Sequence, residues 1–318
     1  MKPFLIITGM HRSGTSFLIR ALNLRGIYLG KSQDLVSDDW LPYQDNLRGH
    51  WEHKKVVELN ENTLEYSGGS WDNIPVKIQI NETIRKETKD FITELLNYKS
   101  LGAGIKDPRF LLSSEMWLPF LPKDFLVVGI YREPLKVAES LKKRNGFNYA
   151  KSIKLWKIYN QKLLQLLEKN NGFLLNFDWE KEKLFDEIDL ICNKLALPTS
   201  LKLDEWYTPS LMQSDRSYDS NYKIDEDTKL ILSKLNNKAQ QNENVSVKKI
   251  IRSEEELMYT IINYLIQLQK QGIYFKKVND ENLKKIKKLQ KLIDEIHESI
   301  TWKLLQKIDN IKKKLHMT

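Results

Sequence analysis

The feature that most constrains the fold is an apolar run near the start of the chain, followed at once by a glycine-rich turn. The run 4–8 is apolar up to its last residue, and the segment 17–24 repeats apolar residues at helical spacing. Between them lies Gly-Met-His-Arg-Ser-Gly-Thr-Ser, residues 9–16. A buried strand, a tight turn and a helix form the first unit of an α/β fold.

Three further apolar runs, 103–106, 125–131 and 173–177, predict strands of the same sheet. Helical patterns separate and follow them, at 82–97, 135–144, 150–168 and 184–195. Strands that alternate with helices predict an α/β fold with a central, mostly parallel sheet flanked by helices. Ligands of such sheets bind at the carboxyl ends of the strands, so we expect the functional residues just after each strand.

Length and periodicity together predict one main domain with helical additions. The 318 residues, 41% of them hydrophobic, can form one core of ordinary size. Periodicity fades between 197 and 222, so we place the α/β domain at residues 1–215. Helical patterns near 226–240 and 254–271 predict an α-helical extension over residues 216–278.

Residues 279–318 are predicted to form a basic amphipathic helix or coiled coil. From Asn282 onward there are ten lysines against four acidic residues. The apolar stripe, in steps of three or four, consists of Ile286, Leu289, Ile293, Ile296, Ile300, Leu304, Ile308, Ile311 and Leu315. Such a helix can pair with a second copy into a homo-oligomer or lie peripherally on an anionic membrane, and both alternatives stay open.

Composition narrows the class of protein. Cys192 is the only cysteine, which excludes an internal disulfide or a cysteine-based zinc site and indicates a reducing, cytoplasmic location. The first apolar run is too short for a signal peptide, and no run is long enough to span a bilayer. The net charge of +9 suits an anionic ligand, a nucleic acid or an anionic lipid surface, without choosing among them.

The turn after the first strand has the features of an anion-binding loop. Gly9 and Gly14 allow a tight turn, so that successive N–H groups and the start of the next helix can face a phosphate or sulfate. The two glycines have the spacing of the nucleoside-triphosphate loop. However, Thr15 stands where that loop requires lysine, and the basic residue is Arg12. This argues against a kinase or another nucleotide hydrolase.

The loop resembles the 5′-phosphosulfate-binding loop of bacterial sulfotransferases that use 3′-phosphoadenosine 5′-phosphosulfate (PAPS). Four later segments also resemble blocks of that family, in its order and over roughly residues 1 to 210. They are Asn-Leu-Arg-Gly-His-Trp-Glu (46–52), Lys-Asp-Pro-Arg (106–109), Tyr-Arg-Glu-Pro (131–134) with Ser140, and Phe-Asp-Trp-Glu (177–180). The resemblance implies a P-loop-like sulfotransferase fold and a transferase that needs no metal.

The resemblance also assigns the donor site. The residues that would hold the phosphosulfate are Arg12, Ser13, Gly14, Thr15 and Ser16, and those that would hold the 3′-phosphate are Arg132 and Ser140. Charge gathers on the oxygens of the transferring group, and we expect Arg12 and Lys106 to stabilise it. Asp107 is expected to hold Lys106 or a loop amide in place.

A base must take the proton of the acceptor hydroxyl during transfer. Glu52 is our choice, because a glutamate base recurs in related sulfotransferases; His50 and His53 are the rivals, and sequence alone leaves the three open. The resemblance implies a carbohydrate acceptor, such as a polysaccharide or its precursor.

Aromatic residues could stack on an acceptor sugar, although tryptophans at helical spacing more often belong to the core; the candidates are Trp40, Tyr43, Trp51, Trp71 and Trp156. The alternative functions are a P-loop-type small-molecule kinase and a non-enzymatic scaffold built on the basic coiled coil. Nucleic acid is not the partner we expect.

Overall fold

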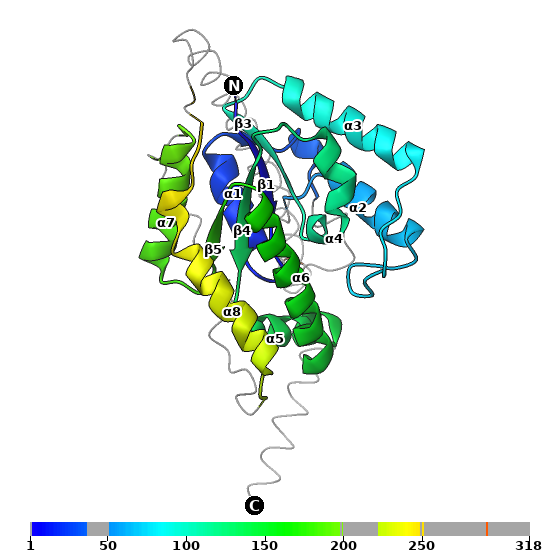
Figure 1. Cartoon of the computed structure of the whole chain (residues 1–318). Helices are drawn as coiled ribbons and strands as arrows, with labels where there is room; N and C mark the ends of the chain where they lie inside the picture. Colours follow the sequence, from blue (N-terminus) through cyan, green and yellow to red (C-terminus); the bar gives the residue numbers. More distant parts are fainter. Residues whose placement is uncertain are drawn as a thin grey trace, which may run out of the picture. The chain divides into compact units, whose positions relative to one another are not determined.

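A computed structural model describes residues 2–36, 51–197 and 222–248, with positions 199, 250 and 291 (Figure 1). Internal contacts divide the chain into two units, Met1–Tyr264 and Leu265–Thr318. Apart from Lys291, every described residue belongs to the first unit. The predicted amphipathic helix at 279–318 and most of the predicted extension at 216–278 lie outside the described residues, so both remain predictions.

The centre of the first unit is a five-stranded sheet in the order β2-β3-β1-β4-β5. The strands are β1 (Phe4–Thr8), β2 (Ile27–Tyr28), β3 (Gly102–Lys106), β4 (Leu126–Tyr131) and β5 (Gly172–Asn176). All four neighbouring pairs within the described residues run parallel. The predicted α/β fold is thereby confirmed, with each of the four predicted strands found within one residue at either end.

Helices cover both faces of the sheet, as predicted. They are α1 (Thr15–Leu24), α2 (Lys54–Tyr66), α3 (Glu82–Asn97), α4 (Phe110–Trp117), α5 (Pro134–Asn145), α6 (Tyr149–Lys169), α7 (Lys181–Lys194) and α8 (Glu226–Ala239). Helices α1 and α7 pack against each other on one face, and α3, α4 and α6 lie on the other side of the sheet in Figure 1. Within the described residues, no helix combines the length and apolar character needed to cross a membrane.

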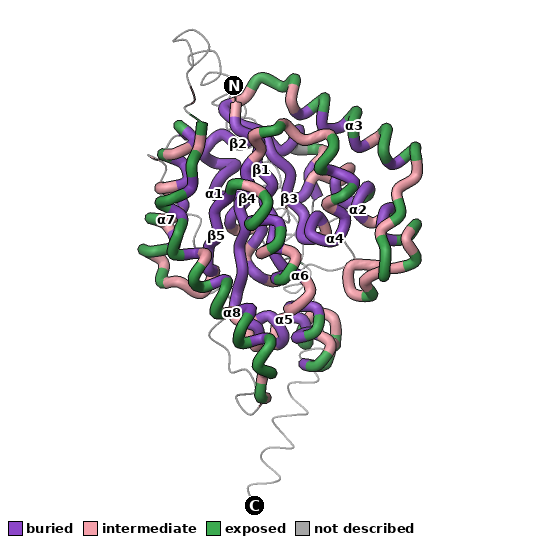
Figure 2. Tube along the Cα trace, in the orientation of Figure 1, coloured by how far each residue is buried: buried purple, intermediate pink, exposed green. Residues whose placement is uncertain are grey.

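Every residue of the five strands is buried, and the strands form the dark interior in Figure 2. A parallel sheet covered on both faces needs such continuous apolar strands. Helix α6 supplies Trp156 and Tyr159 to the core, and α4 supplies Trp117; all three side chains are fully buried. The core therefore fixes the sheet and the helices that follow each strand.

The predicted helix near 226–240 is present as α8, and it packs on β5 and α6. Just after it, Asn242 accepts a hydrogen bond from the backbone N–H of Leu174 and donates one to the Leu174 carbonyl, both at 2.9 Å. The side chain thus replaces a neighbouring strand at the edge of the sheet, which blocks pairing with another chain.

Two glycines allow the loop after β1 to pass close to its neighbours. A Cβ atom at Gly9 would lie 2.0 Å from the carbonyl oxygen of Ile130 in β4. Gly14 has a φ of +88°, and a Cβ atom there would lie 2.3 Å from the ring of Phe177. The loop therefore depends on glycine at both positions.

We expect Gly14→Ala to lower the free energy of unfolding by roughly 2–4 kcal/mol, from the left-handed conformation and from the clash with Phe177. Gly68→Ala is the matched control. Gly68 has a φ of +76°, but its Cβ would meet no atom within 4 Å, so its loss should be roughly 1 kcal/mol. Urea denaturation measures both changes. Equal losses would show that Phe177 does not constrain the loop.

Candidate functional site

The carboxyl ends of β1, β3 and β4 bring the predicted donor loop and the later motifs to one edge of the sheet. Gly14 is the N-cap of α1, and the first turn of that helix carries no acidic side chain. The positive end of the helix and its N–H groups can therefore face an anion. Ser13 is fully buried, and its hydroxyl has no hydrogen-bond partner among the described residues.

Two residues predicted to bind different ends of the donor contact each other. The Nε of Arg12 donates to the Oγ of Ser140 at 2.8 Å, although they lie 128 positions apart in the sequence. Arg132 donates from Nη1 to the carbonyl oxygen of Arg12 at 3.4 Å. The structure thus brings Arg12, Arg132 and Ser140 together.

Arg132 is held from two sides. Its Nε donates to Asp178 at 3.4 Å, and its backbone carbonyl accepts from the indole of Trp156 at 2.8 Å. Asp178 also accepts from the N–H of Glu133 and from Lys136, at 2.8 and 2.9 Å. Burial lowers the pKa of Arg132, although Asp178 acts in the opposite direction.

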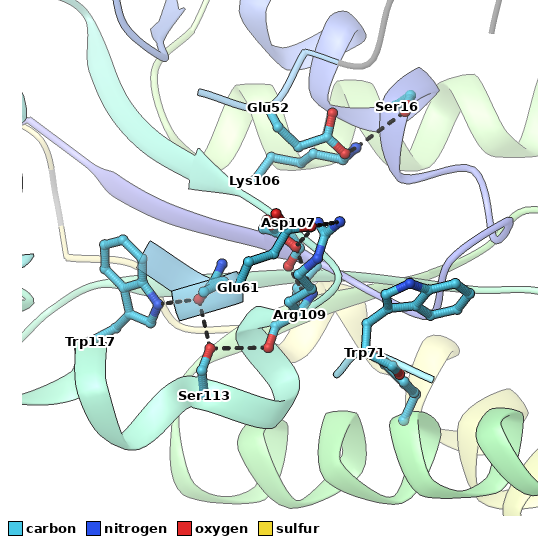
Figure 3. Close-up of polar contacts among 12 residues, drawn as sticks. Ser16, Glu52, Glu61, Trp71, Lys106, Asp107, Arg109, Ser113 and Trp117 are labelled. Carbon is cyan, nitrogen blue, oxygen red and sulfur yellow. Dashed lines mark hydrogen bonds and ion pairs between the residues drawn. The ribbon is translucent and has the colours of Figure 1, made fainter. Parts of the chain in front are cut away.

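Lys106, at the end of β3, forms the polar centre of the site (Figure 3). Its side chain is 1% exposed, and its ammonium donates to the Oε1 of Glu52 and, at 3.2 Å, to the Oγ of Ser16. The Oε2 of Glu52 is buried and has no partner within the described part of the chain. This carboxylate oxygen lies beside the loop and can accept a hydrogen bond from a hydroxyl.

The backbone around Glu52 fixes that carboxylate. The Glu52 carbonyl accepts from the N–H of Val36 at 2.8 Å, and His53 forms a β-bridge with Leu35. Trp51 has a φ of +62°, and the guanidinium of Arg20 lies 4.1 Å from the centre of its ring. The turn that aims Glu52 at Lys106 is therefore held by backbone bonds and by a cation–π contact.

Asp107 contacts Arg109, as Figure 3 shows. Its Oδ1 accepts from the Arg109 N–H at 2.7 Å, so it does hold a loop amide, and both carboxylate oxygens lie 3.2 Å from Nη1. Arg109 also pairs with Glu61 at 2.9 Å. Burial disfavours the charge of Arg109, but Asp107 and Glu61 keep the pKa of Arg109 above its ordinary value.

Of the two histidines considered as bases, His50 lies outside the described residues. His53 is the N-cap of α2, because its Nδ1 accepts from the N–H of Lys55 at 3.1 Å. Its ring packs edge-on against Phe91, and burial lowers the pKa of His53 to about 4. His53 therefore has a structural task that sequence could not separate from a catalytic one.

Sequence reasoning gave no role to His11, in the middle of the donor loop. Its ring centre lies 4.4 Å from that of Trp71 and 5.8 Å from that of Tyr159. Its Nε2 is buried without a partner in the described regions. Burial, and then the charges of the surrounding cations, Arg109 first, lower the pKa of His11 well below its ordinary value. A histidine in a loop carries no sequence signal for such an aromatic setting.

The protonation of His53 predicts how stability depends on pH. Because the folded pKa of about 4 lies below that of an unfolded histidine, the unfolded chain binds a proton first, and stability falls as pH decreases from about 6.5 toward 4. His53→Asn keeps a capping side chain but cannot titrate. Between pH of about 7.5 and about 5, the variant should lose about 2 kcal/mol less unfolding free energy than the wild type. Equal losses in urea titrations at the two pH values would contradict this.

The chain shows only limited similarity, in sequence and in structure, to known proteins. No protein-family model matches the sequence, and no curated protein does. Among solved structures, the sulfotransferase domain of the Synechococcus PCC 7002 olefin synthase aligns at 15% identity and a TM-score of 0.45, over 74% of this chain and 94% of that one. Sulfotransferase STF1 from Mycobacterium tuberculosis H37Rv aligns at 13% identity and a TM-score of 0.35, over 74% and 76%. Values this low establish no family, so a function has to be inferred from the residues of the site.

Proposed function

We propose that this protein is a sulfotransferase that moves a sulfuryl group from PAPS to a hydroxyl of a carbohydrate. The observation that carries the proposal is the buried contact of Lys106 with Glu52 and Ser16 beside the loop after β1. A cation for the transferring group and a carboxylate for the acceptor proton stand together at an anion-binding loop. Sulfuryl transfer to a hydroxyl requires both.

The chain fits the two charged ends of the donor. Loop amides, the start of α1 and the buried hydroxyl of Ser13 are suited to the phosphosulfate. Arg132 would hold the 3′-phosphate through charge-assisted hydrogen bonds and Ser140 through its hydroxyl. The contact of Arg12 with Ser140 supports one continuous site for both ends.

In the proposed reaction, Arg12 and Lys106 bind the oxygens on which negative charge develops, and Glu52 accepts the hydroxyl proton of the acceptor through Oε2. The acceptor oxygen forms a bond to sulfur while the bond from sulfur to the bridging phosphate oxygen breaks, and that oxygen keeps the electron pair. The products are the sulfated carbohydrate and adenosine 3′,5′-bisphosphate. The role of the chain is to position and stabilise, as in phosphoryl transfer.

The arrangement fits a kinase less well. Thr15 occupies the lysine position of the nucleoside-triphosphate loop, and the basic residue near Ser16 comes from β3 instead. The carboxylate closest along the chain to Lys106, Asp107, is engaged by Arg109 through both oxygens. A scaffold without activity would not require a buried ion pair beside an anion-binding loop.

The proposal also covers the cellular location of the enzyme and the role of its C-terminal segment. The buried Cys192, the one cysteine of the chain, fits a reducing cytoplasmic location. The segment 279–318 is proposed to mediate self-association or peripheral contact with an anionic membrane, which would bring the enzyme near a cell-surface polysaccharide precursor.

Calorimetry in metal-free buffer tests the donor site. The wild type should bind adenosine 3′,5′-bisphosphate roughly 10- to 100-fold more tightly than AMP, because only the bisphosphate engages Arg132. Arg132→Ala should abolish that preference, whereas Arg85→Ala, at an exposed position on α3, should keep it. If ATP bound more tightly than the bisphosphate, and only with magnesium, the kinase alternative would be favoured over the proposal.

Glu52→Gln tests the base. The variant keeps the shape of the side chain but cannot accept the proton, so the rate of bisphosphate release from saturating PAPS, with simple sugars as acceptors, should fall roughly 100- to 10,000-fold. Binding of adenosine 3′,5′-bisphosphate should stay within about threefold of the wild type. Glu58→Gln on the surface of α2 is the matched control. If the Glu52→Gln variant had the wild-type rate, the base would have to be another residue.

A further inference from the structure

An aromatic and imidazole cluster includes one residue of the donor loop that has no proposed role in binding the donor. It consists of His11, Trp71 and Tyr159, whose ring contacts converge on His11. The buried Nε2 of His11 has no hydrogen-bond partner within the described segments. Because buried polar groups are almost always bonded, this nitrogen indicates a partner that the protein alone does not supply.

The cluster lies within reach of the reacting groups. His11 directly precedes Arg12, and the charges of both Arg12 and Lys106 act on its imidazole. A molecule bonded to Nε2 would therefore lie at the donor loop, next to Arg12. This is where an acceptor hydroxyl has to be.

Residues of α6 hold Trp71, the indole of the cluster, in place. The hydroxyl of Tyr159 donates to the Trp71 carbonyl at 2.9 Å, and Lys151 pairs with Asp72 at 2.6 Å. The Trp71 ring also stacks on Phe147 with 5.8 Å between ring centres. Figure 3 shows Trp71 beside Arg109, on the opposite side of the site from Trp117. The indole is only partly buried, so the part that stays exposed has a fixed position and can contact a flat, weakly polar face such as that of a sugar ring.

The surrounding charges restrict which molecules can bind. Burial, and after it the charges of Arg109, Arg144, Lys106 and Arg12, lower the pKa of His11 well below its ordinary value. The carboxylates around the cluster are already engaged: Glu52 by Lys106, Asp107 and Glu61 by Arg109, and Asp72 by Lys151. In the protein without its anionic donor, a protonated amine would therefore be repelled, whereas a neutral or acidic ring that bears hydroxyls would not.

We propose that His11 and Trp71 form the acceptor subsite, in which the His11 Nε2 hydrogen-bonds a hydroxyl of a neutral or acidic sugar ring that stacks on Trp71. In the donor-free protein, the subsite excludes sugars that carry a free ammonium group. This inference rests on the proposed function, because it assigns the acceptor side of the same site.

Two sugars that share their ring hydroxyls, N-acetylglucosamine and glucosamine, are suitable probes. At pH about 6.5 glucosamine carries an ammonium group and the acetylated sugar does not. The histidine ring signals of the full-length protein, without the anionic adenosine 3′,5′-bisphosphate, are followed by NMR during each titration. The His11 signal is identified by its loss in His11→Asn. N-acetylglucosamine should shift it, and glucosamine should bind at least about tenfold more weakly.

Variants provide an independent readout through the dissociation constant of N-acetylglucosamine. Trp71→Ala and His11→Ala should each weaken binding by about tenfold, and Trp71→Phe and His11→Gln by less. Tyr66→Ala, at an exposed aromatic of α2, is the control and should bind like the wild type. The affinity for the bisphosphate should change by less than about threefold in every variant, which separates acceptor binding from loss of fold.

The outcomes distinguish this inference from the proposed function. If the bisphosphate binds but N-acetylglucosamine at about 100 mM leaves His11 unmoved, or binds equally well without Trp71, the acceptor subsite is wrong and the donor site stands. Equal binding of both sugars would overturn the exclusion of amines. If the bisphosphate itself does not bind, the proposed function fails and this inference fails with it.

Discussion

The buried pair of Lys106 and Glu52 is the interaction on which the arrangement of the site depends. Moving either charge out of water costs several kcal/mol, so each can be buried only because the other is present. Lys106 comes from the end of β3, while Glu52 comes from a turn anchored on residues 35 and 36. The pair therefore ties the segment before α2 to the sheet. A sequence that lost one partner would leave the other charge uncompensated beside the loop that we propose binds the donor.

The parallel sheet places these groups at one edge, but local strain completes the site. Arg12 and Trp51 both have a positive φ, at 69° and 62°, although neither is glycine. Such residues cost on the order of 1–3 kcal/mol each and persist where the surroundings hold them. One is a proposed ligand of the donor, and the other directly precedes the proposed base. The contacts that hold them, Ser140 for Arg12 and Arg20 for Trp51, come from α5 and α1. These two helices thus fix the conformation of the edge of the sheet where the site lies.

Sequence patterns predicted the central sheet because buried parallel strands are apolar throughout. Strands β1, β3, β4 and β5 each have such a run. The pattern missed β2, whose two residues are too short for any periodicity, and α4, whose apolar residues surround the helix because it is largely buried. The motifs predicted the residues Arg12, Lys106, Arg132 and Ser140, which do converge on the site. They did not predict that His53 caps α2 or that Arg109 binds Asp107, although each of these contacts joins residues only two positions apart. The contact of Arg109 with Glu61 could not be predicted, since it depends on packing between segments 48 positions apart.

Contacts within the protein explain how several cations can lie close together at this edge of the sheet. Each cation that we assign to the donor already contacts an oxygen of the protein: Ser140 for Arg12, Glu52 for Lys106, and Asp178 for Arg132. If the donor binds as proposed, its phosphate and sulfate oxygens would replace these protein oxygens one for one. Binding would then exchange the oxygen partners of these cations, and its electrostatic cost would include the ion-pair contacts that Glu52 and Asp178 give up. The same exchange would turn Lys106 from Glu52 toward the transferring group, and so leave the carboxylate able to take the acceptor proton when the donor is in place.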